Sequence, residues 1–398
     1  MSKTEKPSIR FHGFDDTWEQ RKLGDNIAEY TEKTTINNQY PVLTSSRRGI
    51  FFQTDYYDGN QIASADNTGY NIVPYGYFTY RHMSDDEIFH FNINDITENG
   101  IVSTLYPVFT TDENLDSRYL QYQLNYGKEF AKYAVLQKQG GSRTYMYLNK
   151  LKELRLTIPN FVEEQKKISA YFMKLDNFIT LHQRKFEKLT NVKKSMLEKM
   201  FPQNGSCYPA VRFKGFTGPW ERRKFGDVFE EYSEKNRADL PPLTIIQGSG
   251  TIRRDESERA LQYDKASLSN YKVVNEGDLI VHLRSFEGGL EKANSQGIIR
   301  PAYHTFHGEG VDSRFYYTYF RSKNFIDTDL KPHVYGIRDG RSIDIEGMKT
   351  IEIPFTSYPE QKLIGDAIDS INTLISLQRR ELEKLQSIKK ALLEKMFV

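Results

Sequence analysis

The stretch RFHGFDDTWEQRKLGDNIAEYTEK occupies residues 10–33, and the chain returns to it as RFKGFTGPWERRKFGDVFEEYSEK at residues 212–235. The two tryptophans of the chain, Trp18 and Trp220, stand at the same point of the two copies. Self-similarity at a fixed distance along a chain is the signature of a duplicated structural unit. The sequence therefore predicts two copies of one module.

The repeat extends over the whole chain of 398 residues. Further matches follow in the same order in both halves: PSIRF (7–11) with PAVRF (209–213), Asp116-Ser117-Arg118 with Asp312-Ser313-Arg314, Ile158-Pro159 with Ile353-Pro354, Glu164-Gln165 with Glu360-Gln361, and LEKMF at both 197–201 and 393–397. Matches are sparse across residues 45–145 and 245–340. A shared frame with a divergent interior indicates two related modules that act on two different targets.

Composition is typical of a globular protein, with 27% of the residues charged and 38% hydrophobic. No apolar run approaches the roughly 18 residues of a membrane-spanning helix, and the first residues lack the apolar core of a signal peptide. Cys207 is the single cysteine, which excludes a disulfide framework and a cysteine-based metal site. We expect a cytoplasmic protein with no membrane partner.

Each half closes with a long segment of helical pattern. Residues 163–200 contain no Pro or Gly, and from Gln361 onward only Gly365 interrupts the pattern. Apolar residues recur at spacings of three and four, as in a coiled-coil seam. The residues expected to pair the two helices are Phe172, Leu175, Ile179, Phe186 and Leu189 in the first, and Ile368, Ile371, Ile375, Leu382 and Leu385 in the second.

Both seams also carry polar residues at matching steps, His182 with Gln378 and Lys193 with Lys389. Polar seam positions fix the register of paired helices, so we expect the two helices to pair with each other. The alternative is that each helix lies separately on its own globule. A helix of about 35 residues is about 50 Å long, so a pair would hold two globules at a fixed distance.

The globular parts are typical of a mixed fold. Runs such as YNIVPYGYFTYR (70–81) and YKVVNEGDLIVHLR (271–284) are rich in β-branched and aromatic residues and contain Gly or Pro, as strands with tight turns do. Short helices are expected after Asp116 and Asp312, because Asp is a preferred N-cap residue. The predicted fold class is α+β, divided into a domain at 1–160, a helix at 161–201, a linker at 202–211, a domain at 212–357 and a helix at 358–398.

No motif for catalysis or cofactor binding stands out. The chain lacks the GxxxxGK[ST] phosphate loop, an HExxH or paired Cys/His metal site, and the GxSxG turn of a serine hydrolase. Gly248-Ser249-Gly250 is not followed by the spacing of a dinucleotide-binding motif. The sequence therefore favours a binding function over a catalytic one.

Basic and amide residues cluster beside tyrosines at glycine-flanked turns in both halves. Arg can bind guanine and Gln can bind adenine through two hydrogen bonds, and Lys can hold phosphates. The alternative for any one of these residues is a solvated surface charge. The candidate DNA-binding residues are Arg47, Arg48, Arg81, Lys138, Gln139 and Arg143 in the first half, and Gln247, Arg253, Arg254, Arg284, Arg338 and Arg341 in the second.

Over its full length the chain resembles the specificity subunits of Type I DNA restriction–modification systems. The resemblance rests on the twice-used P-x-x-R-F-x-G-F…W-E-x-[RK]-K-[LF]-G-D opening, the Ile-Pro…Glu-Gln sequence ahead of each long helix, and the paired K-K-x-[LM]-L-E-K-M-F helix ends. It implies that each globule is a target recognition domain that reads one half of a split double-stranded DNA site. It also implies that the two helices form an antiparallel spacer.

The resemblance further implies partner subunits. Two methyltransferase (modification) subunits would dock on the repeated regions, and restriction (motor-nuclease) subunits would join them. S-adenosylmethionine, ATP and Mg²⁺ are expected on those partners and no cofactor on this chain, which would be a non-catalytic subunit of an adenine-methylating complex. Two unlike readers imply an asymmetric bipartite site, and a rod of about 50 Å matches about 15 base pairs.

Two other interpretations stay open from the residues alone. One is a self-contained DNA methyltransferase or nuclease with divergent motifs, and the other is a coiled-coil adaptor whose globules bind protein. If the modules read DNA, the near-identity of residues 10–33 and 212–235 places these stretches in the shared frame. Modules that read different sequences should differ where they touch DNA. Trp18 and Trp220 are expected to anchor the start of each module.

Overall fold

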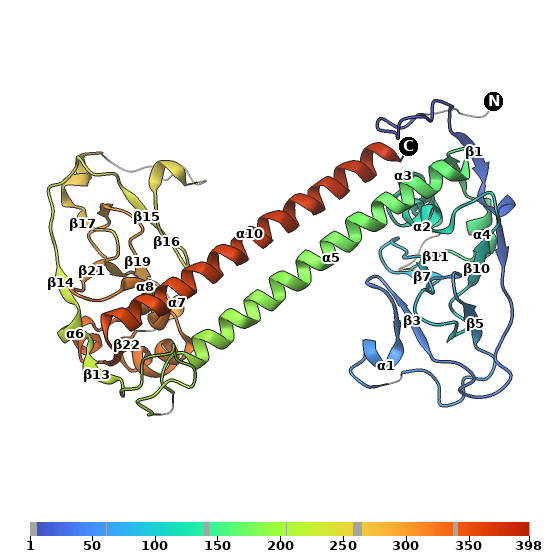
Figure 1. Ribbon diagram of the computed structural model, residues 1–398. Coiled ribbons are helices and arrows are strands. Elements are labelled where there is room, and N and C mark those ends of the chain that lie inside the picture. The colour runs from blue at the N-terminus through green and yellow to red at the C-terminus, as the bar shows by residue number, and fades with distance from the viewer. Residues whose placement is uncertain are drawn as a thin grey trace. The chain divides into compact units, whose positions relative to one another are not determined.

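The computed structural model describes residues 6–60, 62–138, 143–203, 205–257, 265–336 and 341–397 (Figure 1). The chain divides into two compact units, the first formed by Met1–His182 with Glu381–Val398 and the second by Gln183–Arg380. Each unit therefore contains one globular domain, the beginning of one long helix and the end of the other.

The first unit is built on antiparallel strands that are short and irregularly spaced. They are β1 (Glu19–Lys22), β2 (Ile27–Glu29), β3 (Leu43–Ser46), β4 (Gly49–Phe52), β5 (Asn71–Pro74), β6 (Phe78–Thr79), β7 (Met83–Ser84), β8 (Asn92–Ile93), β9 (Asn99–Val102), β10 (Val108–Thr111), β11 (Thr144–Tyr145) and β12 (Arg155–Ile158). A four-stranded sheet has the order β2-β10-β6-β8, and the remaining strands pair as β1–β12, β3–β4, β5–β9 and β7–β11.

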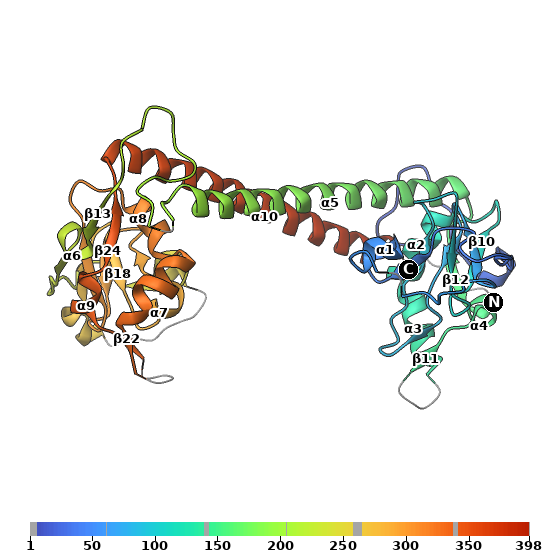
Figure 2. The same ribbon diagram turned by 90° about the horizontal axis from the view of Figure 1, so that it is seen from below.

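The second unit repeats this topology apart from the pair formed by β7 and β11. Its strands are β13 (Glu221–Lys224), β14 (Glu230–Tyr232), β15 (Leu243–Ile246), β16 (Gly250–Arg253), β17 (Lys272–Val274), β18 (Leu279–Val281), β19 (Glu291–Lys292), β20 (Gly297–Ile299), β21 (His304–His307), β22 (Val334–Tyr335), β23 (Ser342–Ile343) and β24 (Glu352–Phe355). The sheet order is β14-β21-β18-β19, with pairs β13–β24, β15–β16, β17–β20 and β22–β23. Figure 2 shows β13 beside β24. The duplicated α+β module is thus confirmed.

Several of the helices also correspond between the units. In the first they are η1 (Leu23–Asp25), α1 (Gln53–Tyr56), α2 (Ser117–Tyr126), α3 (Lys128–Leu136), α4 (Leu148–Glu153) and the start of α5 (Val162–Lys199). In the second they are α6 (Phe225–Val228), η2 (Arg254–Glu256), η3 (Lys265–Asn270), α7 (Ser285–Gly288), α8 (Ser313–Phe320), the π-helix η4 (Phe325–Leu330), η5 (Lys331–His333), α9 (Ile345–Lys349) and the start of α10 (Tyr358–Met396).

The two predicted N-caps are confirmed. The Asp116 carboxylate accepts a hydrogen bond from the backbone N–H of Tyr119 at the start of α2. The Asp312 carboxylate accepts one from the N–H of Arg314 at the start of α8. Each bond satisfies an N–H that has no partner within the helix, so the repeated Asp-Ser pair fixes where each helix begins.

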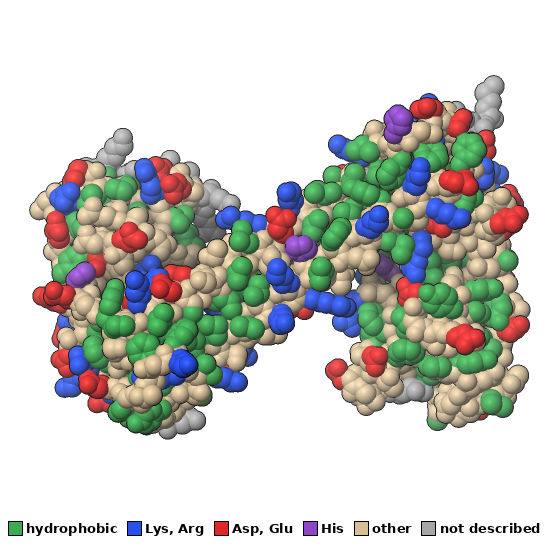
Figure 3. All heavy atoms as spheres, viewed as in Figure 1, with side chains coloured by type: hydrophobic (Ala, Val, Ile, Leu, Met, Phe, Trp, Pro, Cys, Tyr) green, Lys and Arg blue, Asp and Glu red, His purple; other side chains and the backbone are tan. Residues whose placement is uncertain are grey.

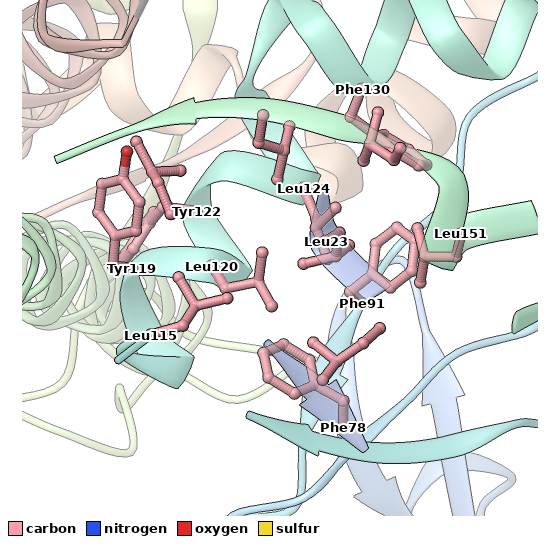
Figure 4. Close-up of a cluster of buried hydrophobic side chains, with 14 of the residues drawn as sticks. Leu23, Phe78, Phe91, Leu115, Tyr119, Leu120, Tyr122, Leu124, Phe130 and Leu151 are labelled. Atoms are coloured by element: carbon pink, nitrogen blue, oxygen red, sulfur yellow. The ribbon is translucent and has the colours of Figure 1, made fainter. Parts of the chain in front are cut away.

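Side chains from the sheet and from the helices that cover it meet in one core in the first unit. Figure 4 shows them pointing toward one another from η1, from β6 and the chain before β8, from α2 and α3, and from α4: Leu23, Phe78, Phe91, Leu120, Leu124, Phe130 and Leu151. The rings of Phe78 and Phe109 stack at 4.6 Å between centroids. Burying each such side chain contributes about 1.5–3 kcal/mol.

The repeated motifs meet at the start of α5 in the first unit. Arg10 donates two hydrogen bonds to the buried carboxylate of Glu164, at 2.6 and 2.7 Å. The side chain of Gln165 accepts from the backbone N–H of Asp116 at 2.8 Å. Trp18 is fully buried and makes an edge contact with Tyr119 at 6.3 Å. These residues are a structural frame.

The second unit contains the same frame. Arg212 donates to the buried Glu360 at 2.6 and 2.8 Å, and the indole N–H of Trp220 donates to the same carboxylate at 3.1 Å. Gln361 accepts from the backbone N–H of Asp312 at 3.0 Å. The expectation that the two tryptophans anchor the modules is confirmed, since both are buried within this frame.

The two long helices, of 38 and 39 residues, are confirmed. In the first unit Phe397, directly after α10, stacks at 5.8 Å on Phe172 near the start of α5. In the second unit Phe201, two residues after α5, shares a core with Ile364 and Ile368 near the start of α10. In both units the end of one helix lies beside the start of the other, as in an antiparallel pair.

Burial along the helices follows the predicted seam. All ten predicted pairing residues are buried or half-buried, whereas Phe178 and Leu181 of α5 are exposed. At the polar steps, Gln378 is buried and Lys389 forms an ion pair with Asp176 at 2.6 Å. Each helix thus starts in one unit and ends in the other.

Candidate nucleic-acid interface

Two hairpins at corresponding places carry the first candidate DNA-binding residues. The β3–β4 hairpin turns at Arg47 and Arg48, after Ser46 pairs with Gly49. The β15–β16 hairpin turns at residues 247–249, after Ile246 pairs with Gly250. Both hairpins lie in the segments where the two halves of the sequence diverge, as readers of different targets should.

A glycine in a neighbouring strand pair allows each hairpin to pack closely. A Cβ atom on Gly100 of β9 would lie 2.2 Å from Cδ1 of Leu43, and one on Gly297 of β20 would lie 2.5 Å from Cγ of Leu243. Such distances exclude a side chain at either glycine unless the leucine moves. The support beneath the hairpins is therefore duplicated, although the turns themselves differ.

In the first unit, the loop that follows β7 brings three candidate cations together. The cations come from the β3–β4 turn, from the chain after α3 and from the chain before β11, and each is paired with one of three consecutive carboxylates. The ion pairs are Arg143 with Asp85, Arg47 with Asp86, and Lys138 with Glu87. Three segments that are far apart in the sequence therefore form one cluster, which we call the acidic-loop cluster.

The acidic-loop cluster is electrically balanced. The Arg47 guanidinium and the Ser84 hydroxyl hold the pKa of Asp86 below its ordinary value, so this carboxylate is ionised at neutral pH. The side chains of Arg47 and Arg143 are about half exposed, at 56% and 51%. Exposed ion pairs are weak because water screens them, so DNA phosphates can compete with the loop for these cations.

A cavity of about 220 Å³ lies beside this cluster. Its wall includes the exposed Arg81 and the β3 residues up to Arg47. Three tyrosines, Tyr56, Tyr57 and Tyr106, complete one side of it. The cavity thus combines guanidinium donors with aromatic surface, the two features by which proteins hold nucleic-acid phosphates and bases.

In the second unit, α7 occupies the place of the acidic loop and gathers the candidate residues there. The Arg341 guanidinium lies 5.3 Å from the ring centroid of Phe286. The Gln247 side chain packs on Gly288, where a Cβ atom would lie 2.0 Å from its Nε2. Arg284 is the exposed N-cap residue of α7. The same topological position is therefore the centre of both candidate surfaces.

His282 supports the turn ahead of α7. Its Nδ1 accepts a hydrogen bond from the backbone N–H of Arg284 at 3.3 Å. Burial, together with the nearby charges of Arg321 and Arg284, lowers the pKa of His282 to about 4. The imidazole is therefore neutral at physiological pH and acts as an acceptor.

A larger cavity of about 670 Å³ follows the β15–β16 hairpin. Arg254 and Tyr303 line it, and Tyr303 stands where the first unit has Tyr106. Arg254 is only 7% exposed, and its Nε donates to the Thr244 hydroxyl at 3.4 Å. The structure thus places this candidate in the cavity wall, rather than at the tip of a solvated turn.

The remaining candidates are distributed around these surfaces. The Arg48 guanidinium lies 4.6 Å over the ring of Tyr56, and Arg253 forms an ion pair with Asp255 at 2.9 Å. Gln139 and Arg338 lie outside the described residues.

An aromatic stack beside the acidic-loop cluster was not among the residues predicted from the sequence. Tyr145 and Tyr147 are partly exposed, with ring centroids 5.8 Å apart and planes inclined by 12°. Tyr147 also stacks at 5.0 Å on the buried His82. Exposed aromatic rings can stack on bases. The signal was the alternation in TYMY, residues 144–147, which places two tyrosines on one side of an extended segment.

Charged side chains of both signs are interspersed on the face of the molecule in Figure 3, in keeping with a formal net charge of +2.

Within the described ranges, no group of His, Cys, Asp and Glu side chains has the arrangement of a metal site. No helix in those ranges combines the length and the apolarity needed to cross a bilayer.

Comparison with known proteins finds a family to which part of this chain is similar. Residues 15–191 match the family model of the Type I restriction modification DNA specificity domain, and the second unit repeats most of the topology of this part of the chain. The resemblance found in the sequence is thereby confirmed.

Individual relatives agree with this assignment. The chain is 25% identical over 315 residues to the Type I restriction enzyme MjaVIII specificity subunit of Methanocaldococcus jannaschii, covering 74% of this chain and 72% of the relative. It is 23% identical over 300 residues to a chain of the same organism provisionally assigned as the MjaX specificity subunit, covering 70% and 67%.

A solved structure has the same fold. The crystal structure of the Type I restriction-modification S subunit from M. genitalium aligns over 99% of both chains with a TM-score of 0.60 and 12% sequence identity. At this identity the likeness establishes the architecture, namely two domains and two long helices, and leaves the contacts of the divergent turns to be argued from this chain.

Proposed function

We propose that this chain is the non-catalytic specificity subunit of a cytoplasmic Type I restriction–modification complex and that it recognises an asymmetric bipartite DNA site. The observation that carries the proposal is the contrast within each unit. The frame around Trp18 and Trp220 is the same, whereas the hairpin turns and the segments that follow β6 and β18 differ. Each domain then reads its own half-site.

The two long helices set the gap between half-sites in this proposal. At 1.5 Å per residue, helices of 38 and 39 residues are each about 57 Å long. Because both ends of each helix pack in the hydrophobic core of a folded unit, the helices can serve as a ruler. A substitution on an exposed helix face should leave the gap unchanged, and an inserted or deleted turn should change it.

The partners follow from the repeated surface. Two modification subunits would dock on the duplicated frame, one per half, and restriction subunits would join through the complex. S-adenosylmethionine, ATP and Mg²⁺ would be bound by those subunits. The docking follows from the family resemblance and from the equivalence of the two frames, in which Arg10–Glu164 and Arg212–Glu360 have the same geometry.

A domain exchange tests the proposal. Residues 36–150 would be replaced by the same region of a relative of known specificity, and methylated adenines would be mapped in cells that produce the complex. We expect one half-site to change and the other to stay as in the parent. A change in both half-sites, or in neither, would contradict modular recognition.

A second experiment separates binding from catalysis. The purified chain alone would be incubated with DNA, S-adenosylmethionine, ATP and Mg²⁺. We expect neither methylation nor cleavage without partner subunits, together with DNA binding that weakens by orders of magnitude between low and moderate salt. Chemistry by the chain alone would favour a self-contained enzyme, and binding that is indifferent to salt and sequence would favour a protein-binding adaptor.

A further inference from the structure

A buried polar side chain lies directly beneath each candidate hairpin. Asn92 of β8 pairs with Thr79 of β6 across the sheet, and Glu291 of β19 pairs with Ile280 of β18. Because β6 and β8 correspond to β18 and β19, the two side chains occupy the same position of the duplicated fold. Asn92 is 7% exposed and Glu291 is fully buried.

Glu291 is bound to the turn of the β15–β16 hairpin. Its carboxylate accepts hydrogen bonds from the backbone N–H groups of Gly248 at 2.7 Å and Gly250 at 3.1 Å. Tyr317 donates its hydroxyl to the same carboxylate at 2.9 Å, and Arg321 forms an ion pair with it. The buried charge is therefore compensated, as a buried carboxylate must be.

The Gly-Ser-Gly sequence of this turn is explained by that carboxylate. Gly248 and Gly250 have φ angles of +88° and +77°, which side-chain-bearing residues rarely adopt. This conformation directs two N–H groups to one side, and turns of this kind form anion-binding nests. Here the anion is Glu291, so the turn that presents Gln247 is fixed from below.

Asn92 supports the hairpin turn of the first unit in the same way, but as a hydrogen-bond donor instead of an acceptor. Its Nδ2 donates to the Ser45 hydroxyl at 2.8 Å and to the Ser46 carbonyl at 2.9 Å. The Ser46 hydroxyl in turn accepts from the backbone N–H of Arg48 at 3.1 Å. An amide donor beneath one turn and a carboxylate acceptor beneath the other therefore hold two differently shaped turns.

We propose that Asn92 and Glu291 are positioning residues, each of which sets the sequence preference of its own half-site by fixing the hairpin turn above it, without contacting DNA. This inference rests on the proposed function in DNA recognition. It differs from a structural role because each residue would act on one half-site only.

The test uses the full-length chain with whatever subunits co-purify. The protein would be offered a pool of random-sequence duplexes, and the bound DNA would be sequenced. Glu291→Gln keeps the shape of the side chain but removes the charge and replaces one acceptor oxygen with an NH₂ donor, so it can no longer accept both glycine N–H bonds. Tyr317→Phe removes one hydrogen bond from the same carboxylate and serves as a milder variant. Asn92→Asp replaces the donor in the first unit, and Glu346→Gln, on an exposed carboxylate of α9, is the matched control.

We expect Glu291→Gln to reduce discrimination at one half-site by at least tenfold and to leave the other half-site unchanged. Tyr317→Phe should have a smaller effect at the same half-site, Asn92→Asp should affect the opposite half-site, and Glu346→Gln should affect neither. Thermal melting identifies any variant that does not fold. If Glu291→Gln does not fold, the effect of Tyr317→Phe on half-site discrimination tests the proposal for the second unit.

The outcomes separate the two proposals. A wild-type chain that selects no sequence would overturn the proposed function, and this inference with it. A wild-type chain that selects a bipartite site, with folded variants that keep its preferences or lose both half-sites together, would overturn the positioning role alone.

Discussion

The ring of Phe397, the penultimate residue of the sequence, lies 5.7 Å from the ring of Tyr119 in the core of the first unit. Phe201 and Phe315 repeat this contact in the second unit at 5.0 Å. The LEKMF sequence that closes each half of the chain therefore completes the core of the other half's domain. A residue far away in sequence is thus part of each domain's folding unit.

Phe397→Ala should destabilise the first unit by about 3–5 kcal/mol, because a buried aromatic ring is removed from a packed core. Denaturant unfolding followed by tyrosine fluorescence and circular dichroism measures the change. Phe178→Ala is the control, because the Phe178 side chain on α5 is 53% exposed. It should change stability by less than about 0.5 kcal/mol. Equal effects of the two substitutions would contradict the inference that the end of α10 completes the core of the first unit.

Glu360→Gln should destabilise the second unit by about 3–5 kcal/mol, since it leaves the largely buried Arg212 without its counter-charge. Glu352→Gln removes a carboxylate that is 62% exposed on β24 and pairs with Arg222, and it should have little effect. Thermal melting compares the two variants. A melting temperature of Glu360→Gln equal to that of the wild type would show that the ion pair is dispensable to the frame.

Arg143→Ala and Arg341→Ala should each weaken DNA binding at one half-site. Loss of a base contact should cost about 1–3 kcal/mol and relax specificity there, whereas loss of a phosphate contact should weaken binding to all sequences about equally. Titration of labelled duplexes with either half-site scrambled distinguishes these results. If neither substitution changes the affinity, the two arginines are surface charges only.

Asp86→Asn should increase DNA affinity by a few fold, because Arg47 loses the carboxylate that competes with phosphate. The dependence of log affinity on log salt should steepen by up to about one unit, the change expected for one additional phosphate contact. Asp25→Asn, on an exposed residue of η1 in the frame, is the matched control. An unchanged or lower affinity of Asp86→Asn would mean that the acidic loop supports the DNA-binding conformation instead.

The second unit should lose stability as the pH falls from about 6.5 to about 4. In the folded state the pKa of His282 is about 4, whereas an unfolded chain has a histidine pKa of about 6.5. The unfolded state therefore binds the proton first, so the stability that neutral His282 provides is present above pH 6.5 and is lost below it. At this half-buried site the effect is on the order of 1 kcal/mol.

His282→Asn should flatten that pH dependence, because asparagine keeps an acceptor for the Arg284 N–H but does not titrate. Urea unfolding at pH 7 and pH 4.5, with the wild type and the variant side by side, measures the difference. A wild type and a variant with the same pH dependence would show that other groups govern acid unfolding of this unit.

Much of the fold was predictable because its signals are local. The 3/4 spacing of apolar residues predicted both long helices, and the Asp-Ser pairs predicted the start of α2 and α8 through N-cap chemistry. The duplication also predicted that both tryptophans would anchor their modules. Each of these inferences depends on neighbouring residues or on comparing one half of the chain with the other.

The candidate surfaces could be predicted only in part. The positions of Arg47, Arg143 and Arg341 in turns were visible in the sequence, but their pairing with Asp86, Asp85 and the ring of Phe286 was not. The role of Gly248-Ser249-Gly250 was also missed, because the carboxylate that the turn binds lies more than 40 residues later in the chain.

The sequence by itself determined that the protein has two related modules and two long helices, each with an apolar seam. It also showed that the residues of the frame are nearly identical in the two modules, whereas the segments with the candidate DNA-binding residues differ. Only the tertiary structure decided that the helix ends close the opposite cores, that an acidic loop neutralises three candidate cations, and that Asn92 and Glu291 support the hairpins. These features depend on non-local contacts between side chains, and periodicity and composition carry no information about which distant residues meet.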